Sequence, residues 1–212
     1  MLLLTASLSF AFGCDAPIFS TLAAPALPGS GKAFVTGEGK LDGDTVIGAR
    51  FAMHASAPYA AWKRVLGDPE HQDDWVPDKF GYDLVERLDA AHLYLQVNVG
   101  FLFGAVRVRR QIVAAVEAVD HGASFTTCWA KVDPTPFLTQ IARFHGDAEW
   151  QDSSAGWWSV APAPDGSTLV AHQWWSAAGG VPAAVLKFGA TRTLPDLLDA
   201  FEARAEALAA AG

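Results

Sequence analysis

The feature that most constrains the fold is a period-two alternation of apolar and polar residues, which is typical of β-strands with one buried face. The clearest example is segment 92–103. Its apolar members fall on one side of an extended chain: Leu93, Leu95, Val97, Val99 and Phe101. Similar patterns predict strands at 45–56, 82–88, 106–119, 124–132, 155–161 and 167–175. Pro164-Asp165-Gly166 has the residues of a tight turn and predicts a hairpin between the last two strands.

The first predicted strand is followed by a helix signal. Ser56 is a favourable N-cap and Pro58 suits a first helical turn, so we expect a helix from there to about Leu66. Gly67 ends it. A second short helix or acidic loop follows and ends near residues 75–77.

The C-terminal part of the chain predicts a longer helix. Residues 181–188 look helical, with Pro182 at their start, and the pattern resumes after a possible bend near residues 189–195. Beyond it, apolar residues recur at helical spacing and form one buried stripe. The stripe consists of Leu194, Leu197, Leu198, Phe201, Ala205 and Leu208.

Residues 1–31 predict a leader and linker that precede a single domain over residues 32–212. The apolar run at 2–12 is too short to cross a hydrocarbon layer of about 30 Å as a helix. It is typical of the hydrophobic part of a secretory signal. Small residues suited to cleavage follow it at Ala23, Ala24 and Ala26. We therefore expect an exported protein, periplasmic or secreted.

Other interpretations of the N-terminal segment stay open. No Lys or Arg precedes the apolar run, and Pro25 disfavours one of the cleavage positions. Cys14 lies in a poor version of a lipoprotein processing site, so a lipid-anchored Cys14 or a misassigned start are alternatives. The protein would be cytoplasmic if the leader is not a true signal. Cleavage would leave Cys128 as the single cysteine, which we expect to be a buried structural thiol.

Composition narrows the class of function. Lys and Arg number 15 against 23 Asp and Glu, so a net charge of −8 argues against a nucleic-acid partner. Hydrophobic residues make up 51% and charged residues 18%, which excludes a disordered chain. Eight Trp and 13 Phe carry a large apolar surface that must either fill a core or line a cavity.

Motifs for cofactors and metals are incomplete. Segment 29–32 lacks the first glycine and the Ser or Thr of a phosphate loop, and the glycines of 37–43 miss the dinucleotide spacing by one residue. Both are interpreted as loop glycines. No two histidines have metal-ligand spacing, and the acidic cluster at 68–74 is interpreted as a solvated helix face. We expect no cofactor and no metal.

The order of the predicted elements resembles the helix-grip fold, which START lipid-transfer domains share with birch-pollen allergens and polyketide cyclases in the SRPBCC superfamily. Five stretches in family order carry the resemblance: Phe51–Asp68, Trp75-Val-Pro77, Val108–Val113, Asp165–Thr168 and Gly179–Pro182. The third resembles the START strand written arginine-aspartate-aromatic-valine, with Gln111 and Ile112 in place of the middle pair. The resemblance covers roughly residues 45–208.

The resemblance implies an α+β fold in which a curved antiparallel sheet wraps around a long C-terminal helix, with two short helices after the first strand. It also implies the binding and transfer of a hydrophobic small molecule, most simply a lipid, in an internal cavity. We expect a monomer that contacts membranes transiently. The expected cavity lining is Leu95, Val97, Val99, Phe101, Arg110, Trp129, Trp158, Val185, Phe188 and Phe201.

Arg110 is the unusual member of this set. On the predicted strand it shares a face with apolar residues only, and a charge there is costly unless it is paired or meets polar ligand atoms or water. Glu86, on another predicted strand, could be its partner. Alternatively, a bulge near Arg109 turns the guanidinium to solvent, or the arginine serves a purely structural ion pair.

Two further functions compete with lipid binding. An enzyme on the same scaffold, such as a cyclase, dehydratase or hydrolase, would need an acid or base in the cavity, and the candidates are His172, Glu86 and Arg110. A protein-interaction module would instead fill the interior with its own side chains. Fold alone does not decide among these.

Overall fold

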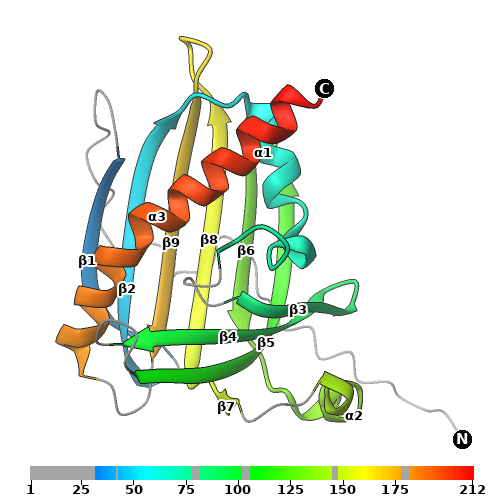
Figure 1. Ribbon diagram of the computed structural model, residues 1–212, viewed down its shortest axis with the longest axis vertical. Helices are drawn as coiled ribbons and strands as arrows, with labels where there is room; N and C mark the ends of the chain where they lie inside the picture. The colour runs from blue at the N-terminus through cyan, green and yellow to red at the C-terminus, as the bar shows by residue number, and fades with distance from the viewer. Residues whose placement is uncertain (1–31, 42, 78–81, 102–105, 145–147, 178–181) are drawn as a thin grey trace, which may run out of the picture.

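The computed structural model describes residues 32–41, 43–77, 82–101, 106–144, 148–177 and 182–212. Strands dominate the described residues, and three α-helices accompany them (Figure 1). The strands are β1 (Lys32–Leu41), β2 (Asp44–Ala55), β3 (Tyr82–Asp89), β4 (His92–Phe101), β5 (Val106–Asp120), β6 (Phe125–Lys131), β7 (Glu149–Trp150), β8 (Ser153–Pro162) and β9 (Thr168–Ala177). The α-helices are α1 (Tyr59–Leu66), α2 (Leu138–Ile141) and α3 (Ala183–Ala210). Short 3-10 helices occupy Pro69–His71, Thr135–Phe137 and Ala142–Phe144.

All nine strands belong to a single sheet with the order β1-β2-β9-β8-β6-β5-β4-β3, and β7 pairs with β5 outside this path. Every neighbouring pair along the path is antiparallel, whereas the short β5–β7 pair is parallel. Strand β5 is 15 residues long, and it pairs with β4 along its first part and with β6 along its last part. The sheet therefore bends along β5, so that β3 and β4 run across the direction of β8 and β9 (Figure 1).

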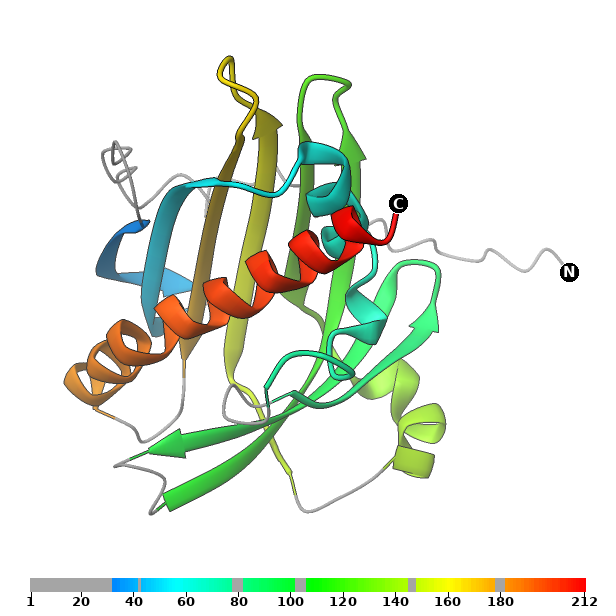
Figure 2. The ribbon, with the colours of Figure 1, turned by 45° about the horizontal axis from the view of Figure 1, so that its top comes forward.

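Helix α3 crosses one face of this curved sheet, and α1 lies beside its C-terminal part (Figure 2). The predicted fold class, an α+β helix-grip arrangement with a long C-terminal helix, is confirmed. We call the face covered by α3 the inner face, defined by Ala49, Phe51, Trp158, His172 and Trp129. On β2 the residues of this face are buried: Ile47, Ala49, Phe51 and Met53.

Helix α3 is continuous although Pro195 lies inside it. Proline lacks an amide hydrogen, so the helix loses one backbone hydrogen bond there. In the preceding turns the hydroxyls of Thr191 and Thr193 donate to the carbonyls of Lys187 and Gly189. The predicted apolar stripe is the packed side of the helix, with four residues fully buried: Leu194, Leu198, Phe201 and Ala205.

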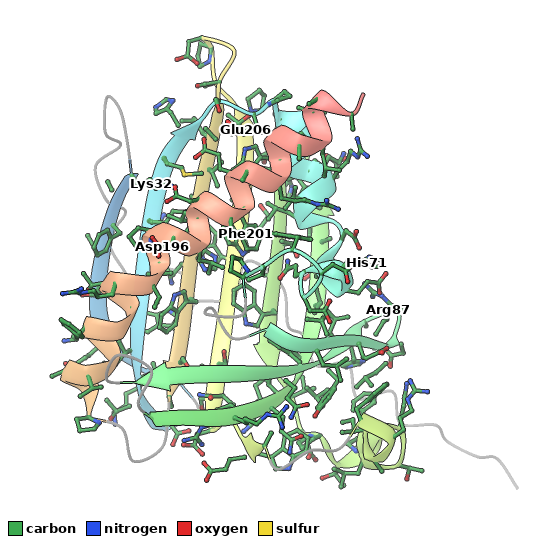
Figure 3. All side chains as sticks on the ribbon, in the orientation of Figure 1. Lys32, His71, Arg87, Asp196, Phe201 and Glu206 are labelled. Atoms are coloured by element: carbon green, nitrogen blue, oxygen red, sulfur yellow. The ribbon has the colours of Figure 1, made fainter. Side chains whose placement is uncertain are left out.

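Ion pairs hold α3 against the edge strand β1. Lys32 pairs with Asp199, and Lys187 donates to Glu38 at 2.6 Å. Figure 3 places Lys32 on the same side of the molecule as Asp196 of α3. These pairs are partly exposed, so each contributes roughly 0–1 kcal/mol, and the buried stripe contributes more to holding the helix.

Strand β1 corrects the sequence analysis for Gly37 and Gly39, which were interpreted as loop residues, whereas Gly43 lies in a turn as expected, with a φ of 91°. Gly39 and Gly48 lie under the indole of Trp175, and a Cβ atom would come within 3.1 Å of the ring at Gly39 and 2.3 Å at Gly48. The glycines therefore let a large ring lie flat on the outer face of the sheet. This use of glycine inside a strand produces the same local pattern as a loop.

The start of α1 is a second correction. The N-cap is Pro58, without a side-chain cap hydrogen bond. The hydroxyl of Ser56 instead donates to Glu206 Oε1 of α3 at 2.6 Å. The predicted end at Gly67 is confirmed, and so is the turn at Gly166, whose φ of 86° favours glycine. Strand β7 and the short helices between 135 and 144 were not predicted, because segments of two to four residues carry no usable periodicity.

Cys128 lies on the outer face, next to Ala155 and Trp157, and is fully buried. It is disulfide-bonded, which corrects the expectation of a free structural thiol. The other cysteine of the sequence, Cys14, lies outside the described residues.

Candidate ligand-binding face

The pairing register of β4 and β5 shows which of their residues lie on the inner face of the sheet. Leu95 lies opposite Ile112 and Val97 opposite Arg110, and the pairing continues to Phe101 opposite Val106. Directly opposite residues share a face of the sheet. Through β6 this face continues to Phe125, which belongs to the same core cluster as Phe201 of α3. The side chains of Val97, Val99 and Phe101 lie outside the described side chains, and Leu95 is half-buried.

An aromatic cluster covers the centre of the inner face. It consists of Phe51, Trp129, Trp158, His172 and Phe201, which come from β2, β6, β8, β9 and α3. The His172 ring stacks on Trp158 with a centroid distance of 4.1 Å and on Trp129 at 5.7 Å, and it contacts Phe51 at 5.1 Å. Trp158 also stacks on Phe201 at 4.4 Å. Figure 3 shows Phe201 between α3 and the central strands.

His172 is the polar member of this cluster and is only 3% exposed. Its Nδ1 lies 2.8 Å from the carbonyl oxygen of Trp157, so Nδ1 carries the hydrogen and donates. Burial lowers the pKa of His172 to about 3, because the charged ring would lose its hydration. The ring is therefore neutral at physiological pH, and its Nε2 presents a lone pair.

The position of Trp129 depends on a glycine in the neighbouring strand. Trp129 lies opposite Gly156, and a Cβ atom at Gly156 would come within 2.3 Å of the indole. The indole therefore lies flat across β8 and reaches His172 on β9. By contrast, the adjacent residues Trp157 and Trp158 point to opposite faces, as the alternation predicts: Trp158 packs in the main core, and Trp157 lies outside under Arg50.

Arg110 lies on the inner face and is 7% exposed. Its Nη1 lies 3.0 Å from Oε2 of Glu149, which sits beside it in the β5–β7 pair and is largely exposed. The expected partner Glu86 is wrong, because Glu86 lies opposite Tyr94 and so faces away from the inner row. Pairing of β4 with β5 continues without a shift through Arg110, so no bulge turns the guanidinium outward.

Comparison with solved structures identifies the fold, whereas comparison of sequences finds no match. No family model and no curated protein sequence matches the chain. The STAR-related lipid transfer protein (fragment 25–204) from Xanthomonas axonopodis aligns over 86% of this chain and 98% of its own, with a TM-score of 0.59 and 15% identity. Human STARD10 aligns over 83% and 69%, with a TM-score of 0.62 and 13% identity. Human StAR-related lipid transfer protein 5 aligns over 85% and 83%, with a TM-score of 0.58 and 10% identity.

This chain has the helix-grip fold of START domains. The fold places a curved sheet around a C-terminal helix, and among the described side chains the two buried ionisable ones, Arg110 and His172, share the inner face. Identities of 10–15% show the fold alone. Within the described ranges, no helix is long and apolar enough to cross a membrane.

The N-terminal part of α3 departs from the expected lining of the helix-grip interior. Phe188 is 56% exposed, and the guanidinium of Arg192 lies 5.1 Å from its ring centroid. The expectation that Phe188 faces the interior is therefore wrong, because its position six residues before Leu194 places it on a different side of the helix from the buried stripe. Val185 is half-buried, and Phe201, at 1% exposed, is buried as expected.

The acidic cluster after α1 lies at the surface of the helix-grip domain. Ligand atoms of Asp68, Glu70 and His71 lie within 4.8 Å of one another. They already have partners, since the His71 ring bonds to Asp68 and Glu70 pairs with Arg87. The hydrogen bond to Asp68 is the largest cause that raises the pKa of His71. The cluster is thus a set of surface ion pairs, in agreement with the solvated face expected from sequence (Figure 3).

Sequence reasoning missed two parts of this face. Glu149 gave no signal, because it belongs to a two-residue strand. His172 was considered only as a catalytic candidate, although the alternation of β9 places it on the same face as Trp174. Its contacts with β6 and β2 depend on strand order, which the sequence pattern does not contain.

Proposed function

We propose that this protein binds a hydrophobic small molecule, most simply a lipid, between the inner face of the sheet and α3, and transfers it. The observation that carries the proposal is the inner face itself, which is mostly apolar or aromatic on β2, β6, β8 and β9 and whose buried ionisable groups, among the described side chains, are His172 and Arg110. The fold shared with START domains supports it.

The energetics are sufficient without any covalent step. Each ligand methylene that leaves water gains about 0.8 kcal/mol. An acyl chain of about ten methylenes therefore gains roughly 8 kcal/mol before the entropy cost of association. Arg110 supports a polar contact at one end of the face, because Glu149 occupies one of its guanidinium nitrogens and is itself exposed.

Access for the ligand requires part of the fold to move. We place the opening at the N-terminal part of α3, where Phe188 is exposed and a Cβ atom at Gly189 would meet nothing within 4 Å. Gly179 and Gly180, which precede α3 in the sequence and are the other candidates for a hinge, lie outside the described residues. Lys187 and Arg192 flank Phe188, and this combination supports transient contact with an anionic membrane surface.

Ligand capture tests the central proposal. Purified protein is incubated with a total lipid extract and its native mass is measured, and we expect a mass increment that matches one lipid class. Leu95→Trp adds bulk on the inner face and is expected to lower the ligand-bound fraction. Leu169→Trp is the matched control, because Leu169 is also half-buried but lies on the outer face. Apo protein alone across all lipid classes would contradict the proposal.

Membrane contact is tested separately by flotation with vesicles that contain anionic lipid. We expect Phe188→Ala to reduce the bound fraction, whereas Leu138→Ala, at an exposed apolar residue of α2, leaves it unchanged. Equal flotation of the wild type and both variants would argue against α3 as the contact site.

Export through residues 1–31 remains part of the proposal. N-terminal sequencing of the mature protein is expected to start after the small residues at 23–26. A chain that retains Met1 would oppose export by this route.

The enzyme alternative gains no support from the geometry. Its three candidates are not brought together, because Glu86 faces away from Arg110 and His172. A histidine with a pKa of about 3 is also poorly matched to general acid–base catalysis near neutral pH.

A further inference from the structure

The aromatic cluster contains a polar atom whose chemistry restricts what the inner face can bind. The ring of His172 uses Nδ1 to bond the carbonyl of Trp157. In the part of the chain that the structure describes, this is the hydrogen bond of the ring, and Nε2 has none. The cluster therefore contains an unfilled acceptor within an apolar surface.

The tautomer determines which ligand atom can complement it. A carbonyl oxygen only accepts, so Nδ1 must hold the hydrogen, and Nε2 of the neutral ring can only accept. The neighbouring rings of Trp129, Trp158 and Phe51 are uncharged and limit the approach of water. A carboxylate or phosphate would place a second acceptor against Nε2 and would be repelled. A hydroxyl or an amide N–H would form a hydrogen bond.

His172 and Arg110 are also far apart on the inner face. The register from β9 through β8 and β6 leads from His172 to Trp158, Thr127 and Ala118 of β5. Arg110 lies eight residues from Ala118 along β5, which corresponds to about 26 Å measured along the strand. The acceptor at His172 therefore acts independently of the charge at Arg110.

We propose that His172 Nε2 accepts a hydrogen bond from a hydroxyl or amide N–H of the bound molecule, so that the preferred ligand is a neutral lipid with such a donor. This inference rests on the proposed function and specifies its ligand class. Long-chain alcohols, monoacylglycerols and sterols meet the requirement. The donor group of the ligand would lie among the aromatic rings, with its hydrocarbon part extending along the apolar row of β4 and β5.

The test compares two isomeric probes, 1-dodecanol and undecyl methyl ether, which contain the same atoms but differ in whether the oxygen carries a donor hydrogen. Binding to the wild-type protein is followed by quenching of tryptophan fluorescence, since Trp158 and Trp129 contact His172. We expect the alcohol to bind about fivefold to tenfold more tightly than the ether, as one net hydrogen bond predicts. His172→Phe is expected to remove this preference while the ether still binds.

His54→Phe is the matched control, because His54 is a half-buried strand histidine on the outer face, bonded to Ser167. It is expected to keep the preference for the alcohol. Equal affinity of the wild type for both probes would overturn the assignment of His172 while leaving hydrophobic binding intact. A preference that survives in His172→Phe would also overturn it. Failure of both probes to bind the wild type would contradict the proposed function together with this inference.

Discussion

The imidazole of His172 lies against the indole of Trp158, with ring centroids 4.1 Å apart and planes inclined by 26°. Strands β9 and β8 place the two residues directly opposite each other. Trp158 also stacks on Phe201, so this indole connects the sheet to α3. A neutral polar ring is thereby enclosed where the long helix meets the sheet.

Stability should depend on pH through His172. Its pKa is about 3 in the folded protein and about 6.5 when unfolded, so between these values only the unfolded chain binds the proton. The stabilising contribution is complete above pH 6.5 and is lost as pH falls toward 3, at about 1.4 kcal/mol per pH unit. Urea unfolding of the wild type and His172→Phe between pH 4.5 and 7.5 measures it. Parallel pH profiles for the two proteins would show that His172 does not contribute.

Phe201 and Phe188 should differ sharply in their effect on stability. Phe201 is buried between Trp158 and Trp75, so Phe201→Ala is expected to lower the free energy of unfolding by about 3–5 kcal/mol. Phe188 is exposed, and Phe188→Ala should change it by less than about 0.5 kcal/mol. Chemical denaturation of both variants is the measurement. Similar losses in the two would mean that Phe188 is packed in solution.

Replacing either of two glycines with alanine should change the free energy of unfolding, but in opposite directions. At Gly156 the new methyl group would come within 2.3 Å of Trp129 and 2.7 Å of the Gln173 carbonyl oxygen, so we expect a loss of about 1–3 kcal/mol. At Gly189 nothing lies within 4 Å and the backbone is helical, so alanine should add about 0.5–1 kcal/mol. Thermal unfolding of the two variants distinguishes these outcomes, and a destabilising Gly189→Ala would indicate an unseen contact on α3.

Substitutions of the two partners in the Arg110–Glu149 ion pair should lower the free energy of unfolding by different amounts. Glu149 is largely exposed, so Glu149→Gln is expected to cost no more than about 1 kcal/mol. Arg110→Ala should cost more, because it also removes the buried hydrocarbon stem of the side chain. A double-mutant cycle measures the coupling, which we expect to be below about 1 kcal/mol. A coupling of several kcal/mol would mean that both groups are desolvated.

The sequence pattern was sufficient wherever the controlling interactions are local. Alternation along β4 and β5 placed Arg110 on the same side as Val108 and Ile112, and the register agrees. It also separated Trp157 from Trp158. It did not identify β1, because the close approach of Trp175 to Gly39 and Gly48 requires glycines that look like those of a loop.

What the sequence by itself determined is where most strands lie, which residues of a strand share a face, and the buried stripe of the last helix: a two-residue period and a helical stripe are properties of a short stretch of chain. What only the tertiary structure decided is which faces meet. The pairing of Arg110 with Glu149, and the enclosure of His172 by rings from β2, β6 and β8, depend on strand order and register. These follow from the packing of the whole sheet against α3, where residues distant in sequence compete for the same contacts.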